Sequence, residues 1–163
     1  TPGFDVEFEP SALYEDARLF ADRDHEINGI DAAGIHGFLL GGDVVRMPAD
    51  AQTGLNPRTG QRLQLEIELS TLSDVYLLVR SDHVLGDWLN REYEFTGLET
   101  GVDFVGHADG TDYAGGVGPG RSVDHEHEIW KRKKPAVGRV VVGGPMSKSM
   151  YAVVAVPHRT TNP

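Results

Sequence analysis

Hydrophobic and polar residues alternate with a period of two along much of the chain. In the segment 62–70, RLQLEIELS, every second residue is Leu or Ile and the residues between them are polar or charged. This alternation predicts a β-strand with one buried and one solvated face. The segment 74–81, DVYLLVRS, is almost continuously apolar and predicts a central strand, separated from the first by a short turn around Ser73 and Asp74.

Further apolar runs recur at the spacing of an antiparallel sheet. They are EYEFTGL (92–98), GRVVVGG (138–144) and SMYAVVAVP (149–157), with weaker candidates at 5–10 and 36–47. The segment 17–29 fits either a helix or a strand that enters a Gly turn. Twenty glycines and nine prolines interrupt the chain too often for a helical bundle. We therefore predict an all-β fold, an antiparallel β-sandwich of jelly-roll type with about seven to nine strands.

Two long segments lack the alternating pattern. The segment 48–61 is polar and rich in turn residues, and the segment 101–122 contains seven glycines. Loops of this length in a compact domain are usually functional or mobile. No internal repeat or linker divides the sequence, so we expect a single β-sandwich domain over residues 1–163.

Charge and composition exclude several classes of function. The formal net charge of −10 disfavours nucleic acid and anionic membrane surfaces as partners. No apolar run is long enough for a transmembrane helix. The absence of cysteine excludes disulfides, a thiol nucleophile and thiolate metal ligands. The chain begins at Thr1 without a visible signal peptide, which suggests a processed or excised part of a longer protein.

The order of motifs in the second half resembles a known type of module. SDVYLLVRSDHVLGDWLNREYEFTGL is followed, after the Gly-rich segment, by HEIWKRKKPAVGRVVVGG and MYAVVAV. This order is similar to that of galactose-binding-like, jelly-roll accessory modules in secreted bacterial polysaccharide-degrading proteins. The matching elements are residues 74–80, 86–89, 129–144 and 150–156. The resemblance implies a non-catalytic, carbohydrate-binding module, extracellular or on the cell surface, with a glycan and other domains of a larger protein as partners.

Aromatic residues near polar turn residues are the candidates for glycan contact. A flat ring packs against the apolar side of a pyranose, while amides, acids and Arg reach the hydroxyl groups. Trp88, Asn90 and Arg91 lie together in LGDWLNREY, and Tyr113 lies in the Gly-rich segment. Alternatively, Trp88 closes the end of the sandwich core, because large aromatic residues are mostly buried.

His125 and His127 in SVDHEHEIWKRKKP are the candidate transition-metal ligands. On a strand, residues i and i+2 point to one face about 7 Å apart, where two imidazoles chelate Zn, Cu, Ni or Fe with one or two further ligands. The pair resembles the HxH metal motif of cupins, which gives a second hypothesis, a cupin-like metal-dependent β-barrel enzyme. Lys131 and Arg132, however, stand where the cupin Glu is expected. The alternative is a solvated strand face.

The surroundings of the histidine pair favour a structural interpretation. With Pro135 at a turn, this segment predicts the first strand of a hairpin with 138–144, at a sheet edge protected by the basic run at 131–134. The Gly-rich segment offers Asp103, Asp109 and Asp112 as ligands of a structural Ca²⁺, although Asp-Gly turns explain the same residues. No catalytic motif occurs, so we expect no enzyme. The third hypothesis is a structural or protein-interaction module without a small ligand.

Overall fold

The computed structural model describes residues 6–31, 33–49, 51, 54–55, 59–104, 123–147 and 150–159. In chain order, the elements of this part of the chain are β1 (Glu7–Glu9), β2 (Ala17–Arg18), β3 (His25–Asn28), β4 (Asp43–Arg46), β5 (Gln64–Arg80), β6 (Val84–Leu85), α1 (Trp88–Glu92), β7 (Tyr93–Phe104), β8 (His125–Arg132), β9 (Ala136–Gly143), β10 (Pro145–Ser147) and β11 (Ala152–Pro157). None of the helices described is long and apolar enough to cross a membrane.

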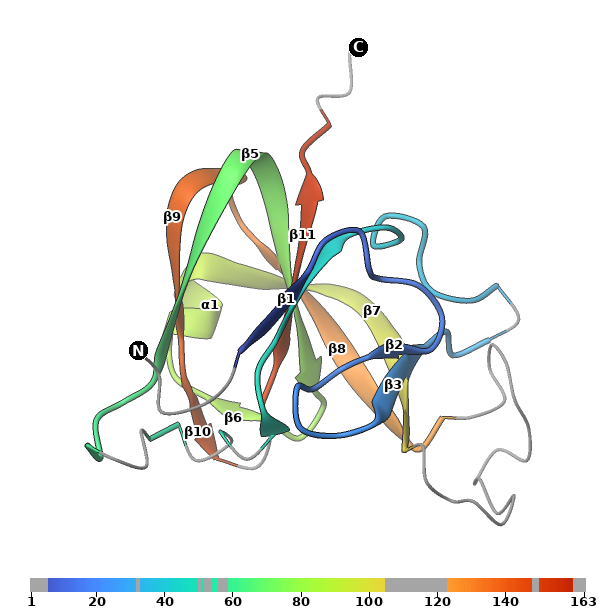
Figure 1. Cartoon of the computed structure of the whole chain (residues 1–163), viewed down its shortest axis with the longest axis horizontal. Coiled ribbons are helices and arrows are strands. Elements are labelled where there is room, and N and C mark those ends of the chain that lie inside the picture. The colour runs from blue at the N-terminus through green and yellow to red at the C-terminus, as the bar shows by residue number, and fades with distance from the viewer. Residues whose placement is uncertain are drawn as a thin grey trace.

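The strands form a strongly curled antiparallel sheet (Figure 1). Its order is β1-β4-β11-β5-β8-β7-β3-β2, with β9 also paired to β5, while β10 and β6 pair separately. The prediction of an all-β antiparallel sandwich is confirmed. The ambiguous segment 17–29 forms two short strands, β2 and β3, which pair with each other.

β5 is one continuous strand of 17 residues that belongs to both layers of the fold. Its first part, up to Leu69, pairs with β9 and alternates between exposed and buried residues. Its second part, from Ser73, pairs with β11 on one side and β8 on the other, and Val75–Val79 are all buried. The predicted turn at Ser73 and Asp74 is therefore wrong. The strand bends through this region because its pairing register shifts between Leu69 and Ser73.

β8 and β9 do not form the predicted hairpin. Both strands run antiparallel to β5 along the same edge of it, β8 beside the second part and β9 beside the first. Pro135 lies in the short link between them, opposite the bend of β5. β8 also pairs with β7, so it is an interior strand and the predicted edge strand is wrong as well. An edge strand would leave one row of backbone groups unpaired, whereas both rows of β8 are used.

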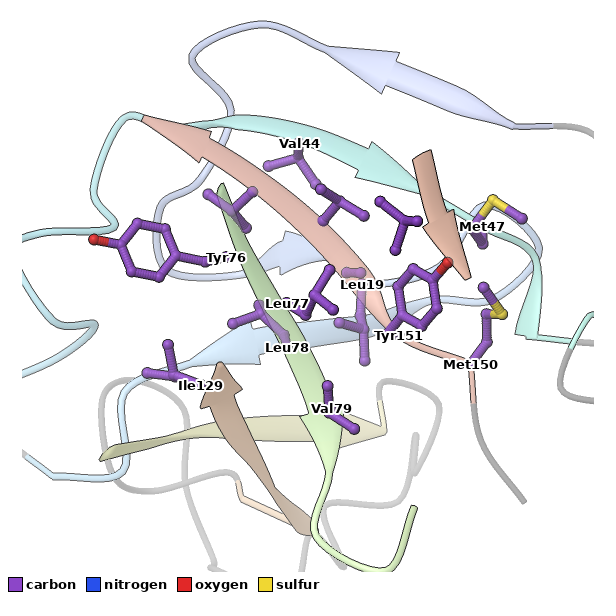
Figure 2. Packing of buried hydrophobic residues seen from close by; sticks show 14 of the residues in the cluster. Leu19, Val44, Met47, Tyr76, Leu77, Leu78, Val79, Ile129, Met150 and Tyr151 are labelled. Atoms are coloured by element: carbon purple, nitrogen blue, oxygen red, sulfur yellow. The ribbon is translucent and has the colours of Figure 1, made fainter. Parts of the chain in front are cut away.

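The sheet buries apolar residues on both faces. Leu78 and Ile129 are paired across β5 and β8 and lie on one face, with Ile27 and Val102 farther along the sheet. Leu77 and Val153 are paired on the opposite face, toward the layer formed by β9 and the first part of β5. Figure 2 shows Met47, Met150 and Tyr151 gathered at one end of this cluster. A strand that is buried on both faces has a nearly continuous apolar sequence, which explains the composition of the segment 74–81.

Trp88, the first residue of α1, closes one end of the core beneath β9. Its ring meets Tyr93 and Tyr151 edge to face, with centroid distances of 6.0 Å to each. Its Nε1 donates a hydrogen bond to the Gly144 carbonyl at 3.2 Å. A Cβ atom on Gly143 would lie 2.4 Å from Trp88 Nε1. Glycine is therefore required here because the indole packs directly on the backbone.

Gly143→Ala should destabilise the protein by about 2 kcal/mol, because the added methyl group displaces the Trp88 ring from a packed site. Gly37→Ala is the matched control, since no atom lies within 4 Å of a Cβ built at Gly37. Urea unfolding followed by Trp fluorescence measures both free energies. Equal stability of the two variants would contradict the packing role of Gly143.

Candidate functional site

A polar cleft of about 450 Å³ lies where β5 ends and β8 begins. Its lining comes from the two strand ends and the residues that flank them: Arg80, Ser81, Asp82, Val123, Asp124, His125 and Glu126. The cleft forms here because the chain turns away from the sheet directly after β5. Val123 follows the Gly-rich segment, whose residues 105–122 lie outside the described part of the chain.

The cleft holds hydrogen-bond donors beside acceptors. Arg80 Nε lies 2.9 Å from Asp82 Oδ1, and this exposed ion pair keeps the guanidinium near the cleft. Ser81 Oγ donates a hydrogen bond to the Glu126 carbonyl at 3.0 Å and ties the end of β5 to β8. A guanidinium and several carboxylates in one cleft can satisfy the donor and acceptor of a hydroxyl group. The arrangement suits a polyhydroxylated ligand.

One face of β8 continues from the cleft as a strip of acidic and aromatic side chains. Glu126, Glu128 and Trp130 alternate along β8 and therefore point to one face. β7 places Glu99 opposite Glu128 and Phe95 opposite Trp130. Paired residues of an antiparallel sheet share a face. We call these five residues the β7–β8 strip.

The aromatic end of the strip is ordered and partly open. The rings of Phe95 and Trp130 stack at 5.7 Å between centroids and 25° between planes. Phe95 is 45% exposed, whereas Trp130 is half-buried. His83 packs edge-on against Trp130, and its Nε2 lies 3.8 Å from Glu128 Oε1. The β7 backbone bulges between Phe95 and Glu99, and Thr96 fixes the bulge by donating a hydrogen bond to the Ile129 carbonyl at 2.7 Å.

Glu99, in the acidic middle of the strip, binds a proton more tightly than an isolated carboxylate does. A hydrogen bond between the Glu99 and Glu126 side chains raises the pKa of Glu99, and burial and the charges of Glu126 and Glu128 raise it further. Like charges so close disfavour joint ionisation. Glu99 can thus hold a proton while it shares a hydrogen bond with Glu126.

His127 points to the opposite, buried face of β8. It is 3% exposed, and within the described residues neither ring nitrogen has a hydrogen-bond partner. Burial, together with the charges of Arg80, His125 and His25, lowers the pKa of His127 to about 3. The ring is therefore neutral at physiological pH, and a solvated strand face is the wrong description of this side chain.

The structure brings His125 and His127 to one face, as the spacing predicts, but they differ in environment. His125 is half-buried at the cleft and His127 lies in the core. Across the described ranges, no group of three or more His, Asp or Glu residues has a geometry that could hold a metal ion. Asp109 and Asp112 lie outside those ranges, and Asp103 is buried on β7 opposite Glu26. The metal assignments stay predictions.

The predicted glycan residues Trp88, Asn90 and Arg91 lie on α1, outside the cleft lining. Asn90 and Arg91 are exposed, and the Asn90 carbonyl accepts a hydrogen bond from Lys133 Nζ at 2.7 Å. Trp88 contacts Tyr93, Tyr151 and the Gly143 backbone, as described above. Tyr113 lies outside the described residues. A sugar-binding role for this turn stays a prediction.

Arg80, Asp82 and the stacked Phe95 and Trp130 are not among the site residues predicted from the sequence. A signal for the first two exists, because RSD directly follows an apolar strand and strand ends are where loops form sites. The pairing of Phe95 with Trp130 has no such signal. Nothing in the sequence states that β7 and β8 are neighbours or how they are aligned.

Comparison with known proteins links this fold to a carbohydrate-active enzyme. No protein-family model matches the sequence, and no curated protein matches it. A solved structure described as "The structure of a beta-glucuronidase from glycoside hydrolase family 2" is similar, with a TM-score of 0.65 and 14% sequence identity. The match covers 95% of this chain and 14% of that chain, so this chain corresponds to a small part of the glucuronidase. At this identity the likeness concerns the fold alone.

His127→Leu should remove part of the acid sensitivity of the protein. Because the folded pKa of His127 lies below its ordinary value of 6.5, the unfolded state binds the proton more tightly. Stability is then lost as the pH falls from about 6 towards 3.5, at about 1.4 kcal/mol per pH unit. Urea unfolding of both proteins at several pH values measures this slope. His125→Leu, at the half-buried neighbour, should keep it, and equal slopes for His127→Leu and the wild type would contradict the prediction.

Proposed function

We propose that this chain is a non-catalytic, glycan-binding accessory module of a larger secreted or surface protein. The fold likeness to part of a glycoside hydrolase family 2 beta-glucuronidase supports an association with carbohydrate. The small share of that protein which the chain matches is what one module of a larger protein would give. The resemblance of the second half to accessory modules supports the same assignment.

The observation that carries the proposal is the cleft at the ends of β5 and β8. A sugar presents hydroxyl groups that both donate and accept, and each one buried without partners is costly. Arg80 supplies donors in a fork, while Asp82 and Glu126 supply acceptors. Arg80 and Glu126 belong to the sheet and Asp82 is the second residue after β5, which reduces the entropy lost on binding.

The metal-dependent enzyme remains the competing hypothesis, and His25, His125 and His127 are close enough for their charges to interact. Elemental analysis of the purified protein tests it. We expect Zn, Fe, Mn, Ni and Cu each well below one equivalent per chain. One equivalent that is retained through dialysis and lost in His125→Ala would favour the enzyme over the binding module.

Arg80→Ala should weaken glycan binding about tenfold, because a charged hydrogen bond contributes about 1.5 kcal/mol or more. A glycan array identifies a ligand, and calorimetry then measures its dissociation constant. Arg139→Ala is the matched control, since Arg139 is an exposed arginine that pairs with Glu66 away from the cleft. Asp82→Ala provides a second cleft variant at an exposed position, in case Arg80→Ala is unstable.

Two results would contradict the proposal. Failure of the wild-type protein to bind any neutral or acidic glycan at millimolar concentration would leave the interaction module as the remaining hypothesis. Binding that resists both cleft variants would place the ligand elsewhere. Asn90→Ala and Arg91→Ala test the α1 turn in the same assay, because both side chains are exposed.

A further inference from the structure

The β7–β8 strip begins at the cleft and ends at an exposed aromatic ring. Glu126 belongs to both the cleft and the strip, so the two surfaces are continuous. From Glu126 to Trp130 the strand advances four residues, or about 14 Å. That length exceeds a single pyranose ring. A ligand held at both ends would have to be an oligosaccharide.

The aromatic end offers what a sugar ring needs. Phe95 is exposed while its stacking contact with Trp130 holds the ring in place, so little side-chain entropy is lost when a ligand packs on it. His83 packs against Trp130, and Thr96 holds the β7 bulge through its hydrogen bond to the Ile129 carbonyl. A flat ring on a rigid sheet provides a platform for the apolar face of a pyranose.

The charge of the strip selects among glycans. Glu99, Glu126 and Glu128 lie between the ring and the cleft, and Glu128 faces His83. The whole chain carries a formal charge of −10, so its net field does not offset the charge of these glutamates. Carboxylates accept hydrogen bonds from sugar hydroxyl groups but repel a uronic acid or a sulfate. The strip therefore favours a neutral glycan.

We infer that the β7–β8 strip is an extended binding surface for a neutral oligosaccharide, with Phe95 as the stacking platform, the three glutamates as hydroxyl acceptors and the cleft at the far end. This inference rests on the proposed function and adds the length and charge of the ligand. It also distinguishes this chain from the glucuronidase that shares its fold, because that enzyme is named for an anionic sugar.

Phe95→Ala should weaken binding of a neutral oligosaccharide about fivefold to tenfold, because the stacking contact is lost. Phe95→Leu should behave alike, since it keeps the apolar volume but not the flat face. Phe8→Ala is the matched control. Phe8 is 63% exposed on β1, which three other strands separate from β8 in the sheet order, and its loss should leave affinity unchanged. Calorimetry with neutral mono-, di-, tri- and tetrasaccharides should show affinity that rises with length in the wild type and less steeply in Phe95→Ala.

A double variant tests how the charge of the strip affects the choice of glycan. Glu99→Gln combined with Glu126→Gln should raise the affinity for a uronic acid oligosaccharide relative to the neutral one of equal length, by about threefold for each charge removed. Thermal unfolding of every variant checks that it is folded before binding is measured.

The outcomes separate the two proposals. If no glycan binds, the proposed function fails. If a glycan binds and Arg80→Ala weakens it, while Phe95→Ala and chain length have no effect, the accessory module stands and the extended surface is wrong. The same conclusion follows if the wild type prefers acidic oligosaccharides. If another domain of the parent protein covers this surface instead, Phe95 would not contact a glycan. Phe95→Ala and chain length would then have no effect on binding.

Discussion

The structure depends on the hydrogen bonding of one long bent strand. β5 pairs with β9 along its first part and with β8 and β11 along its second, so a single segment holds the two layers together. β8 and β9 lie along the same edge of β5 and follow its bend. Backbone groups along the second part of β5 are satisfied through partners on both sides, which is the condition for burying Val75–Val79. Disruption of this strand would separate the layers rather than loosen one of them.

The bend of β5 also determines what each face of β8 does. One face packs Ile129 and His127 into the core, while the other carries the exposed Glu126 and the half-buried Glu128 and Trp130. An imidazole in the first environment remains neutral because its charged form is poorly solvated there. The groups on the second face of β8 stay within reach of a ligand. A two-residue alternation thus gives the two faces of one short segment different environments.

The likeness to part of a beta-glucuronidase agrees with the accessory-module hypothesis but does not supply a site. Fold and function are separable, because function depends on side chains placed on a fold. In the proposed function those side chains are Arg80, Asp82, Glu126 and the stacked Phe95 and Trp130. They lie on strands or at strand ends, where the sheet fixes their positions. Side chains fixed in this way suit the extended glycan surface proposed above.

The sequence by itself determined the all-β class, because period-two alternation and frequent glycines leave few other structures. It also determined the environments of the two parts of β5, half-solvated in RLQLEIELS and buried through Val75–Val79 in DVYLLVRS. Only the tertiary structure decided that these parts form one strand, that β8 and β9 share an edge of β5, and that Phe95 meets Trp130. Burial acts on each residue locally and leaves a periodic pattern. Strand order and register depend on contacts between distant residues, which no local pattern records.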